Sequence, residues 1–163
     1  MRVICDTDLL SALAKTKQLR ILTELFPKAK FYISEAVYEE LTTSKEAGFD
    51  FSDDIFRFTE LVALTEDEFK SYIPLREERR GLGRGELQSM VIAGSRGLVF
   101  LTNDDLAYRV AEERGVRVYK LGDILKFLWK HRIRTKKEVG VLIENIERED
   151  NTFIKNKNMI LSD

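Results

Sequence analysis

Two acidic residues follow apolar segments that have the pattern of buried strands. Asp6 comes directly after the apolar residues 3–5, and Asp104 comes two positions after the run 98–102. The carboxyl ends of parallel strands lie along one edge of a sheet, and open α/β sheets place their chemistry at that edge. We therefore expect both carboxylates there, although capping of the following helices explains each of them equally well when it is taken alone.

Two further acids lie on predicted helices whose apolar faces point toward the core. Glu40 is about 60° around the helix axis from Val37, whereas Glu39 points nearly the opposite way. Glu86 is roughly 40° from Met90 on its own helix. Both glutamates can thus lean toward the edge of the sheet that receives the two aspartates, while Glu39 is expected to face water.

Four carboxylates within a few ångströms would raise one another's pKa values unless a cation lay among them. An oxygen-only ligand set suits Mg²⁺ or Mn²⁺. The chain has one histidine, His131, and one cysteine, Cys5, so it cannot build a zinc cluster from His and Cys alone. We predict a divalent-cation site whose ligands are Asp6, Glu40, Glu86 and Asp104.

The segments that must position these acids alternate between strand and helix patterns. Besides the opening strand, strand patterns occupy residues 30–34, 60–64, 98–102 and 116–121, with helical patterns between them. This alternation predicts a three-layer α/β/α sandwich with a central, mainly parallel sheet of four or five strands. Thr65 with Glu68 predicts a capping box, and Thr135 with Glu138 predicts another.

Two other local signals concern residues 65–94. Pro74 is expected to interrupt or end the helix that Thr65 opens. The glycines at positions 81, 83 and 85 predict a turn that positions Glu86.

The balance of charge gives no global signal for a polyanion partner. Lys and Arg number 27 against 28 acids, and the net charge is -1. Contact with a nucleic acid would therefore need a local basic patch. The candidate RNA-binding patch is Arg76, Arg79, Arg80 and Arg84. An exposed helix face paired with Glu77 and Glu78 explains the same cluster.

The 163 residues are enough for one domain with a sizeable core. We predict a single domain over residues 1–150 and a polar C-terminal tail over 151–163. No segment reaches the length of a membrane span, and the N-terminus lacks a signal-peptide pattern. With a single cysteine suited to a reducing compartment, we expect a cytoplasmic protein without membrane association.

The four acidic motifs together resemble those of the PIN-domain ribonucleases, which include the VapC-type toxins of toxin–antitoxin pairs. The opening strand with Asp6 is similar to that family's first acid, and residues 37–41 are similar to its second-acid helix. Gly85-Glu86 resembles the third acid at a helix start, and residues 101–104 resemble the Thr-x-Asp signature. The resemblance covers roughly residues 1–128 and implies a PIN-like fold.

The resemblance also implies an activity, a cofactor and partners. The expected activity is that of a metal-dependent endoribonuclease, with one or two Mg²⁺ or Mn²⁺ ions activating a water. The four acids that would hold the ions are, by this resemblance, also the catalytic residues. RNA is the implied substrate, a cognate antitoxin is the candidate partner, and a homodimer is the expected assembly. Residues expected to support the acids are Thr7, Asp8, Thr102 and Asp105. Asp8 and Asn103 depart from the family pattern, which often has Asn or Ser, and Asp, at these positions.

Two other functions stay open at this point. Asp6-Thr7-Asp8 also resembles the nucleophile and acid of the haloacid-dehalogenase-type phosphatases, but Leu10 stands where that motif needs Thr or Val. The third interpretation is a non-catalytic RNA-binding PIN-like protein that kept the fold and lost the reaction.

Overall fold

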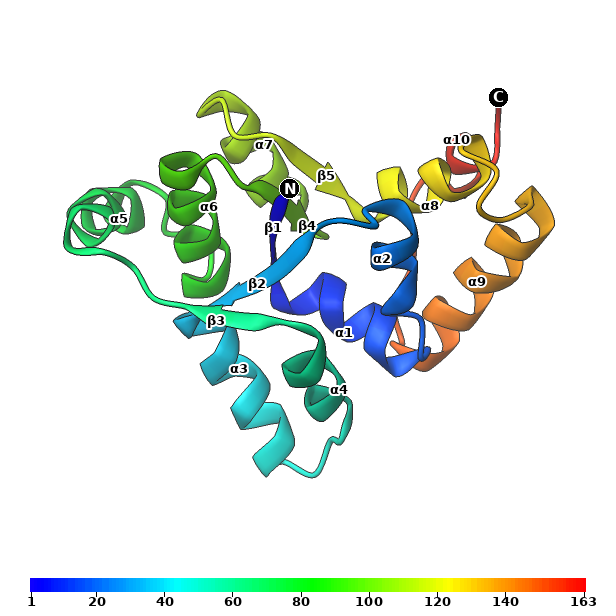
Figure 1. Cartoon of the computed structure of the whole chain (residues 1–163), viewed down its shortest axis with the longest axis horizontal. Coiled ribbons are helices and arrows are strands. Elements are labelled where there is room, and N and C mark those ends of the chain that lie inside the picture. The colour runs from blue at the N-terminus through cyan, green and yellow to red at the C-terminus, as the bar shows by residue number, and fades with distance from the viewer.

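Five parallel strands form the central sheet in the order β3-β2-β1-β4-β5. The computed structural model describes residues 1–163 (Figure 1). Every neighbouring pair of strands is parallel, so the prediction of a mainly parallel sheet of four or five strands is confirmed. The strands are β1 Arg2–Cys5, β2 Lys30–Ser34, β3 Glu60–Val62, β4 Val99–Thr102 and β5 Val118–Lys120.

The strand order places a topological switch point at the centre of the sheet. From β1 the chain winds outward through β2 to β3, and it then returns to lay β4 on the other side of β1. Ile4 of β1 aligns with Tyr32 of β2 and with Phe100 of β4. In open α/β sheets, ligands bind outside the carboxyl ends of the strands at such a point. Here the carboxyl ends of β1 and β4 meet, and Asp6 and Asp104 follow them.

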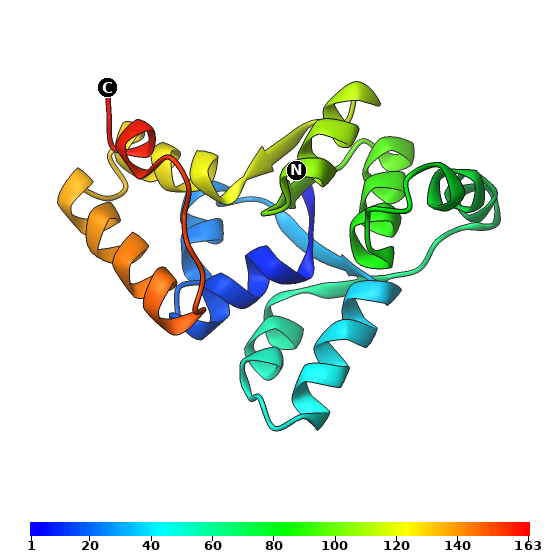
Figure 2. The same cartoon turned by 180° about the vertical axis from the view of Figure 1, so that it is seen from behind.

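Alternate residues of the central strands face two separate cores, which makes the fold a three-layer sandwich. Val3 and Cys5 belong to one core, whereas Ile4 belongs to the other. The helices that cover the first face are α1 Thr7–Lys15, α2 Arg20–Leu25, α3 Glu35–Glu46, α4 Phe51–Phe58, α8 Leu121–Lys130 and α9 Lys136–Glu149. The second face is covered by α5 Glu66–Glu78, α6 Arg84–Arg96 and α7 Asp105–Glu113 (Figures 1 and 2).

Local capping contacts begin several helices, and two of them are the capping boxes that the sequence predicts. Thr65 and Glu68 form a complete capping box at α5, and Thr135 and Glu138 form another at α9. The Ser34 hydroxyl accepts a hydrogen bond from the Val37 amide at 3.2 Å and so caps α3. These contacts fix the starts of the helices independently of distant residues.

The expectation that Pro74 interrupts or ends its helix is wrong, because α5 continues to Glu78. Tyr72 and Leu75, on either side of Pro74, are 2% and 3% exposed in the core beneath α6. Pro74 and the residue four positions earlier, Lys70, both lie on the exposed side. Water can therefore bond the carbonyl that the proline leaves without an amide partner, and burial on the opposite side holds the helix together.

The last segment of the chain packs back onto the domain, as Figure 2 shows in orange to red. Ile154 and Ile160 are buried in the same core as α8, and the helix α10 Lys157–Ile160 lies against α8. The Trp129 indole donates a hydrogen bond to the Ile160 carbonyl at 2.8 Å. The domain boundary at residue 150 stays a prediction, but residues 151–163 are not a purely polar segment.

None of the helices has both the length and the hydropathy that a membrane span requires.

Candidate active site

Asp6 is a buried carboxylate that ties β1 to α1 and to the end of β4. It is 2% exposed. One carboxylate oxygen accepts a hydrogen bond from the Leu9 amide at 2.9 Å, which caps α1. The other accepts the Thr102 hydroxyl and the Asn103 amide, the latter at 3.2 Å. Capping is therefore one of the roles of Asp6, and contact with β4 is another.

The environment of Asp6 disfavours its charged form. Burial raises the pKa of Asp6 from 3.8 to about 7, and the charge of Asp8 adds to the increase. The hydrogen bonds from Thr102, Leu9 and Asn103 lower the pKa but do not outweigh the burial. A carboxyl group with this pKa carries only part of a negative charge near neutral pH, and a cation beside it would favour the ionised form.

Asp104 stands at the start of α7, and Thr102 connects it to Asp6. The Asp104 carboxylate accepts the Ala107 amide at 2.7 Å and so caps α7. The Asp104 amide donates to the Thr102 hydroxyl oxygen at 3.1 Å, while the same hydroxyl donates to Asp6. Thr102 is fully buried. The two strand ends that the sequence places at one edge are thus joined through a single side chain.

Glu40 reaches the site from α3. Its carboxylate accepts the hydroxyl of Thr7, the residue after Asp6. A Cβ atom at Gly85 would lie 3.0 Å from Glu40 Oε1 and 3.1 Å from Val37 Cγ2. A side chain at position 85 would force Glu40 or Val37 to shift, so the glycine lets the start of α6 approach α3 this closely. Glu39, as expected, points elsewhere and pairs with Arg84 at 3.1 Å on the exposed side.

Glu86 is the acid whose electrostatics depend most clearly on the others. It lies in the first turn of α6, and its carboxylate turns back toward Gly83, where a Cβ atom would be 2.6 Å from Oε2. Burial raises the pKa of Glu86, and the negative charges of Asp104, Glu40 and Asp8 raise it further. The acids at the starts of α1, α6 and α7 and on one face of α3 therefore lie close enough to influence one another's charge. We call this interaction their shared electrostatic field.

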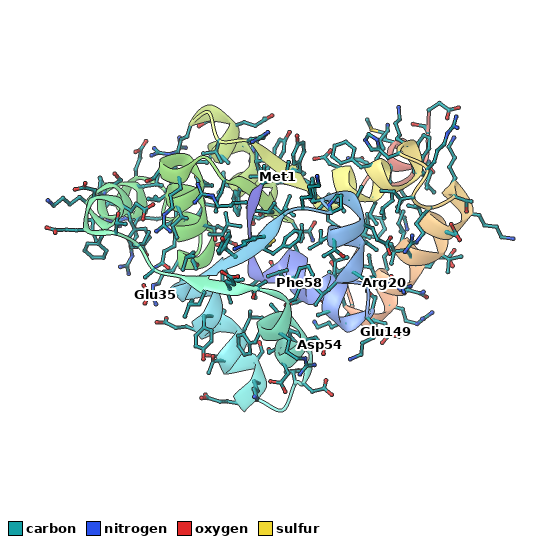
Figure 3. All side chains as sticks on the ribbon, in the orientation of Figure 1. Met1, Arg20, Glu35, Asp54, Phe58 and Glu149 are labelled. Carbon is teal, nitrogen blue, oxygen red and sulfur yellow. The ribbon has the colours of Figure 1, made fainter.

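A fifth and a sixth acid belong to the same field. Burial raises the pKa of Asp8, and the charges of Asp150 and Asp104 add to the increase, while Lys15 lowers it. Asp150 follows the end of α9 and pairs with Lys15 at 2.7 Å. Figure 3 labels its neighbour Glu149 near the far end of α1. Sequence reasoning missed Asp150, because it follows a helix with no motif around it.

The donor set fits a hard divalent cation in its chemistry, whereas the arrangement is not that of a closed metal site. No three side chains among His, Cys, Asp and Glu are grouped closely enough to hold a metal ion. The acids contact threonine hydroxyls and capping amides instead. Carboxylate oxygens are nevertheless the ligands that Mg²⁺ and Mn²⁺ prefer, and the raised pKa values of Asp6 and Glu86 reflect unfavourable charge that a cation would offset.

The other candidate residues lie outside this group or at its margin. Asp105 is exposed and pairs with Lys120 at 3.0 Å and with Lys155 at 3.1 Å, so it is directed away from the acids. Three of the four candidate RNA-binding arginines are held by acids on the surface. Their ion pairs are Arg79–Glu113 at 2.9 Å, Arg80–Glu77 at 2.9 Å and Arg84–Glu39 at 3.1 Å. Arg76 is exposed.

Comparisons with known proteins concern the family and the fold of the chain. The family model DUF3368, described as a PIN domain, matches residues 2–159. A search of curated proteins found no significant match. Among solved structures, the chain is similar to VapBC2 from Rickettsia felis, solved bound to a DNA fragment from its promoter. The two share 18% identity with a TM-score of 0.57, over 74% of this chain and 98% of that one.

A second similar structure is PAE2754 from Pyrobaculum aerophilum. It shares 16% identity with a TM-score of 0.52, over 76% of this chain and 95% of that one. At these identities the structural likeness concerns the fold, and it agrees with the parallel sheet and the three layers described above.

Proposed function

Because the chain belongs to the PIN-domain family, we propose that it is a metal-dependent endoribonuclease that hydrolyses phosphodiester bonds in RNA. The observation that carries the proposal is the shared electrostatic field of the acids at the switch point of the sheet. Burial raises the pKa of Glu86, and the charges of Asp104 and Glu40, which come from other elements of the fold, raise it further. Such clustering of perturbed carboxylates is typical of a functional site.

Under this proposal Asp6, Glu40, Glu86 and Asp104 would hold Mg²⁺ or Mn²⁺. The chemistry that the ion supplies when bound is activation of water and neutralisation of charge on the phosphate. The protein fixes the ligands: three hydrogen bonds orient Asp6, and the Thr7 hydroxyl orients Glu40. Glu86 is partly buried and has a raised pKa, which suits a carboxylate that would orient the attacking water or take its proton.

The proposal includes contacts with the RNA strand and with protein partners. Arg76, Arg79, Arg80 and Arg84 would contact flanking phosphates, with Arg76 the most available because the other three already pair with acids. A cognate antitoxin and a homodimer complete the proposal. Light scattering during size-exclusion chromatography tests the dimer, and a monomer at micromolar concentration would refute it.

Cleavage of a labelled single-stranded RNA with Mg²⁺, with Mn²⁺ and with EDTA tests the activity. The informative variant is Asp104→Asn, because asparagine caps a helix as well as aspartate does, so α7 keeps its cap. We expect cleavage to fall by at least about 100-fold, with unchanged circular dichroism. In EDTA the variant should melt at a temperature no lower than that of the wild type, because the substitution removes the repulsion between the Asp104 carboxylate and those of Asp8 and Glu86.

The matched control is Asp67→Asn, which removes an exposed charge in the first turn of α5 and should leave cleavage unchanged. Cleavage that persists in EDTA, or that survives Asp104→Asn, would refute the proposal. RNA binding without cleavage would support the non-catalytic interpretation. The phosphatase interpretation requires a family other than the one whose model matches residues 2–159.

A further inference from the structure

A pocket of about 500 Å³ opens beside the acidic edge, between the start of α8 and the C-terminal segment. Asn103 and Asp105 line it, and in the chain they stand on either side of Asp104. The Asn103 amide also donates to Asp6. The pocket thus begins where the group of acids ends. Its volume lies within the range of small-molecule binding sites, which is roughly 300–1,000 Å³.

The pocket is basic, in contrast to the edge beside it. Three lysines line it, Lys120, Lys126 and Lys155, against two carboxylates, Asp105 and Asp123. Lys120 and Lys155 share the single carboxylate of Asp105. Lys126 donates to the Met159 carbonyl at 3.0 Å and forms no ion pair. Positive charge at this place can compensate the repulsion that an anionic substrate would meet at the acids.

Large apolar side chains lie exposed at the same pocket. Phe153 is 70% exposed and Met159 is 66% exposed, and both line it. The Lys157 ammonium lies 4.8 Å from the centre of the Phe153 ring. Exposed aromatic rings beside lysines are the surfaces on which the bases of single-stranded nucleic acids stack.

The segment that carries Phe153 is held in place before any ligand binds. Ile154, the next residue, is buried, and its amide donates to Glu147 at 3.1 Å. Lys157 pairs with Glu147 at 3.0 Å. Ile160 is buried and accepts the hydrogen bond from Trp129. The aromatic ring therefore projects from an anchored segment, so little conformational entropy is lost when a base stacks on it.

We propose that this pocket binds one nucleotide of the RNA strand, adjacent to the bond that is cut at the acidic edge. Phe153 stacks on the base, and Lys126 and Lys155 contact the neighbouring phosphate. The inference rests on the proposed endoribonuclease function and adds a defined position for the strand. The strand then passes from the arginines beside α6, across the acids, to the start of α8.

The test is fluorescence anisotropy of the full chain with a labelled single-stranded RNA decamer in EDTA, so that binding is measured without cleavage. Phe153→Ala should raise the dissociation constant by at least about fivefold. Lys155→Gln should lower the slope of log binding constant against log salt concentration by about 0.7. The matched control, Phe49→Ala, removes a ring that is 56% exposed on the α3–α4 connection, far from α10 (Figure 1), and should not change binding.

Photocrosslinking of an RNA that carries 5-iodouridine, followed by peptide mapping, locates the contact. We expect a crosslink on the peptide that contains Phe153. Dissociation constants within twofold of the wild type for both pocket variants, at unchanged melting temperature, would overturn the inference. Equal binding of a DNA decamer would overturn the assignment to RNA. A chain that binds uridine monophosphate but does not bind the decamer would overturn the placement along a strand.

The outcomes separate this inference from the proposed function. A wild-type chain that cleaves RNA, with pocket variants that bind RNA normally, overturns the pocket alone. A chain that never cleaves RNA but binds it in a Phe153-dependent manner overturns the nuclease proposal and leaves the pocket as an RNA site. A chain that does not bind the decamer overturns the pocket as an RNA site, whatever the cleavage assay shows.

Discussion

Asp6 should make the metal-free protein lose stability as the pH rises. Its pKa in the folded protein is about 7, raised chiefly by burial from 3.8, the value it has without the fold. A raised folded pKa gives stability that is complete below the unfolded pKa and is lost as the pH rises through the folded one. Between about pH 4 and pH 7 the free energy of unfolding should therefore fall by about 1.4 kcal/mol per pH unit, or about 4 kcal/mol in total.

The Asp6→Asn variant isolates this effect. Its amide oxygen can still accept the Leu9 amide, but its NH₂ group would face the Asn103 N–H, and two donors cannot bond. This mismatch costs about 1–3 kcal/mol at every pH. The absolute stabilities of the two proteins are therefore less informative than their slopes against pH. We expect the variant to lose about 1.4 kcal/mol per pH unit less than the wild type over this window.

Urea denaturation followed by circular dichroism, between pH 4.5 and pH 8 in EDTA, measures both slopes. Glu68, whose folded pKa is about 2, stays ionised in the folded protein throughout, so any slope that it adds near pH 4.5 comes from its unfolded state and is the same in both proteins. Asp8 and Glu86 also have raised pKa values, so each contributes a loss of stability with rising pH in both proteins. Mg²⁺ should restore wild-type stability at the upper end of the range, because it favours ionised carboxylates. Parallel curves for wild type and variant in EDTA would refute the assignment of a raised pKa to Asp6.

Three further substitutions test other parts of the structure. Thr102→Val should destabilise the fold by about 1–3 kcal/mol in chemical denaturation and should raise the pKa of Asp6, which loses the hydrogen bond from the Thr102 hydroxyl. A pH titration of stability that is identical to that of the wild type would contradict this prediction. Gly83→Ala should displace the Glu86 carboxylate from its position over the start of α6. We expect kcat to fall by about tenfold or more, with little change in melting temperature. An unchanged kcat would show that catalysis does not need the carboxylate at that position. Arg96→Ala should lower the free energy of unfolding by about 3 kcal/mol, because it leaves the buried Glu68 without its ion-pair partner. The variant should also lack the stability that the ionised Glu68 gives above about pH 4.5 and that the wild type loses as the pH falls toward 2. An unchanged midpoint of acid denaturation would contradict this prediction.

The sequence was sufficient for the features that depend on neighbours along the chain. The opening apolar run predicts a strand that is buried on both faces. The capping boxes at Thr65 and Thr135 place helix starts correctly, since each uses only residues three positions apart. The placement of Asp6 and Asp104 after strand ends follows from the same local patterns. Local signals failed at Pro74, where burial of Tyr72 and Leu75 maintains the helix.

Only the tertiary structure decided which side chains share an environment. Thr102 and Asp6 are 96 positions apart, and their hydrogen bond exists because β4 returns to lie beside β1. Asp150 joins the site because α9 packs against α1, and Phe153 lies at its border because the end of the chain folds back against α8. These contacts depend on strand order and helix packing, which neighbouring residues do not encode. The sequence thus determined which residues could do chemistry, and the fold determined which of them act on one another, because their charges interact only across short distances through space.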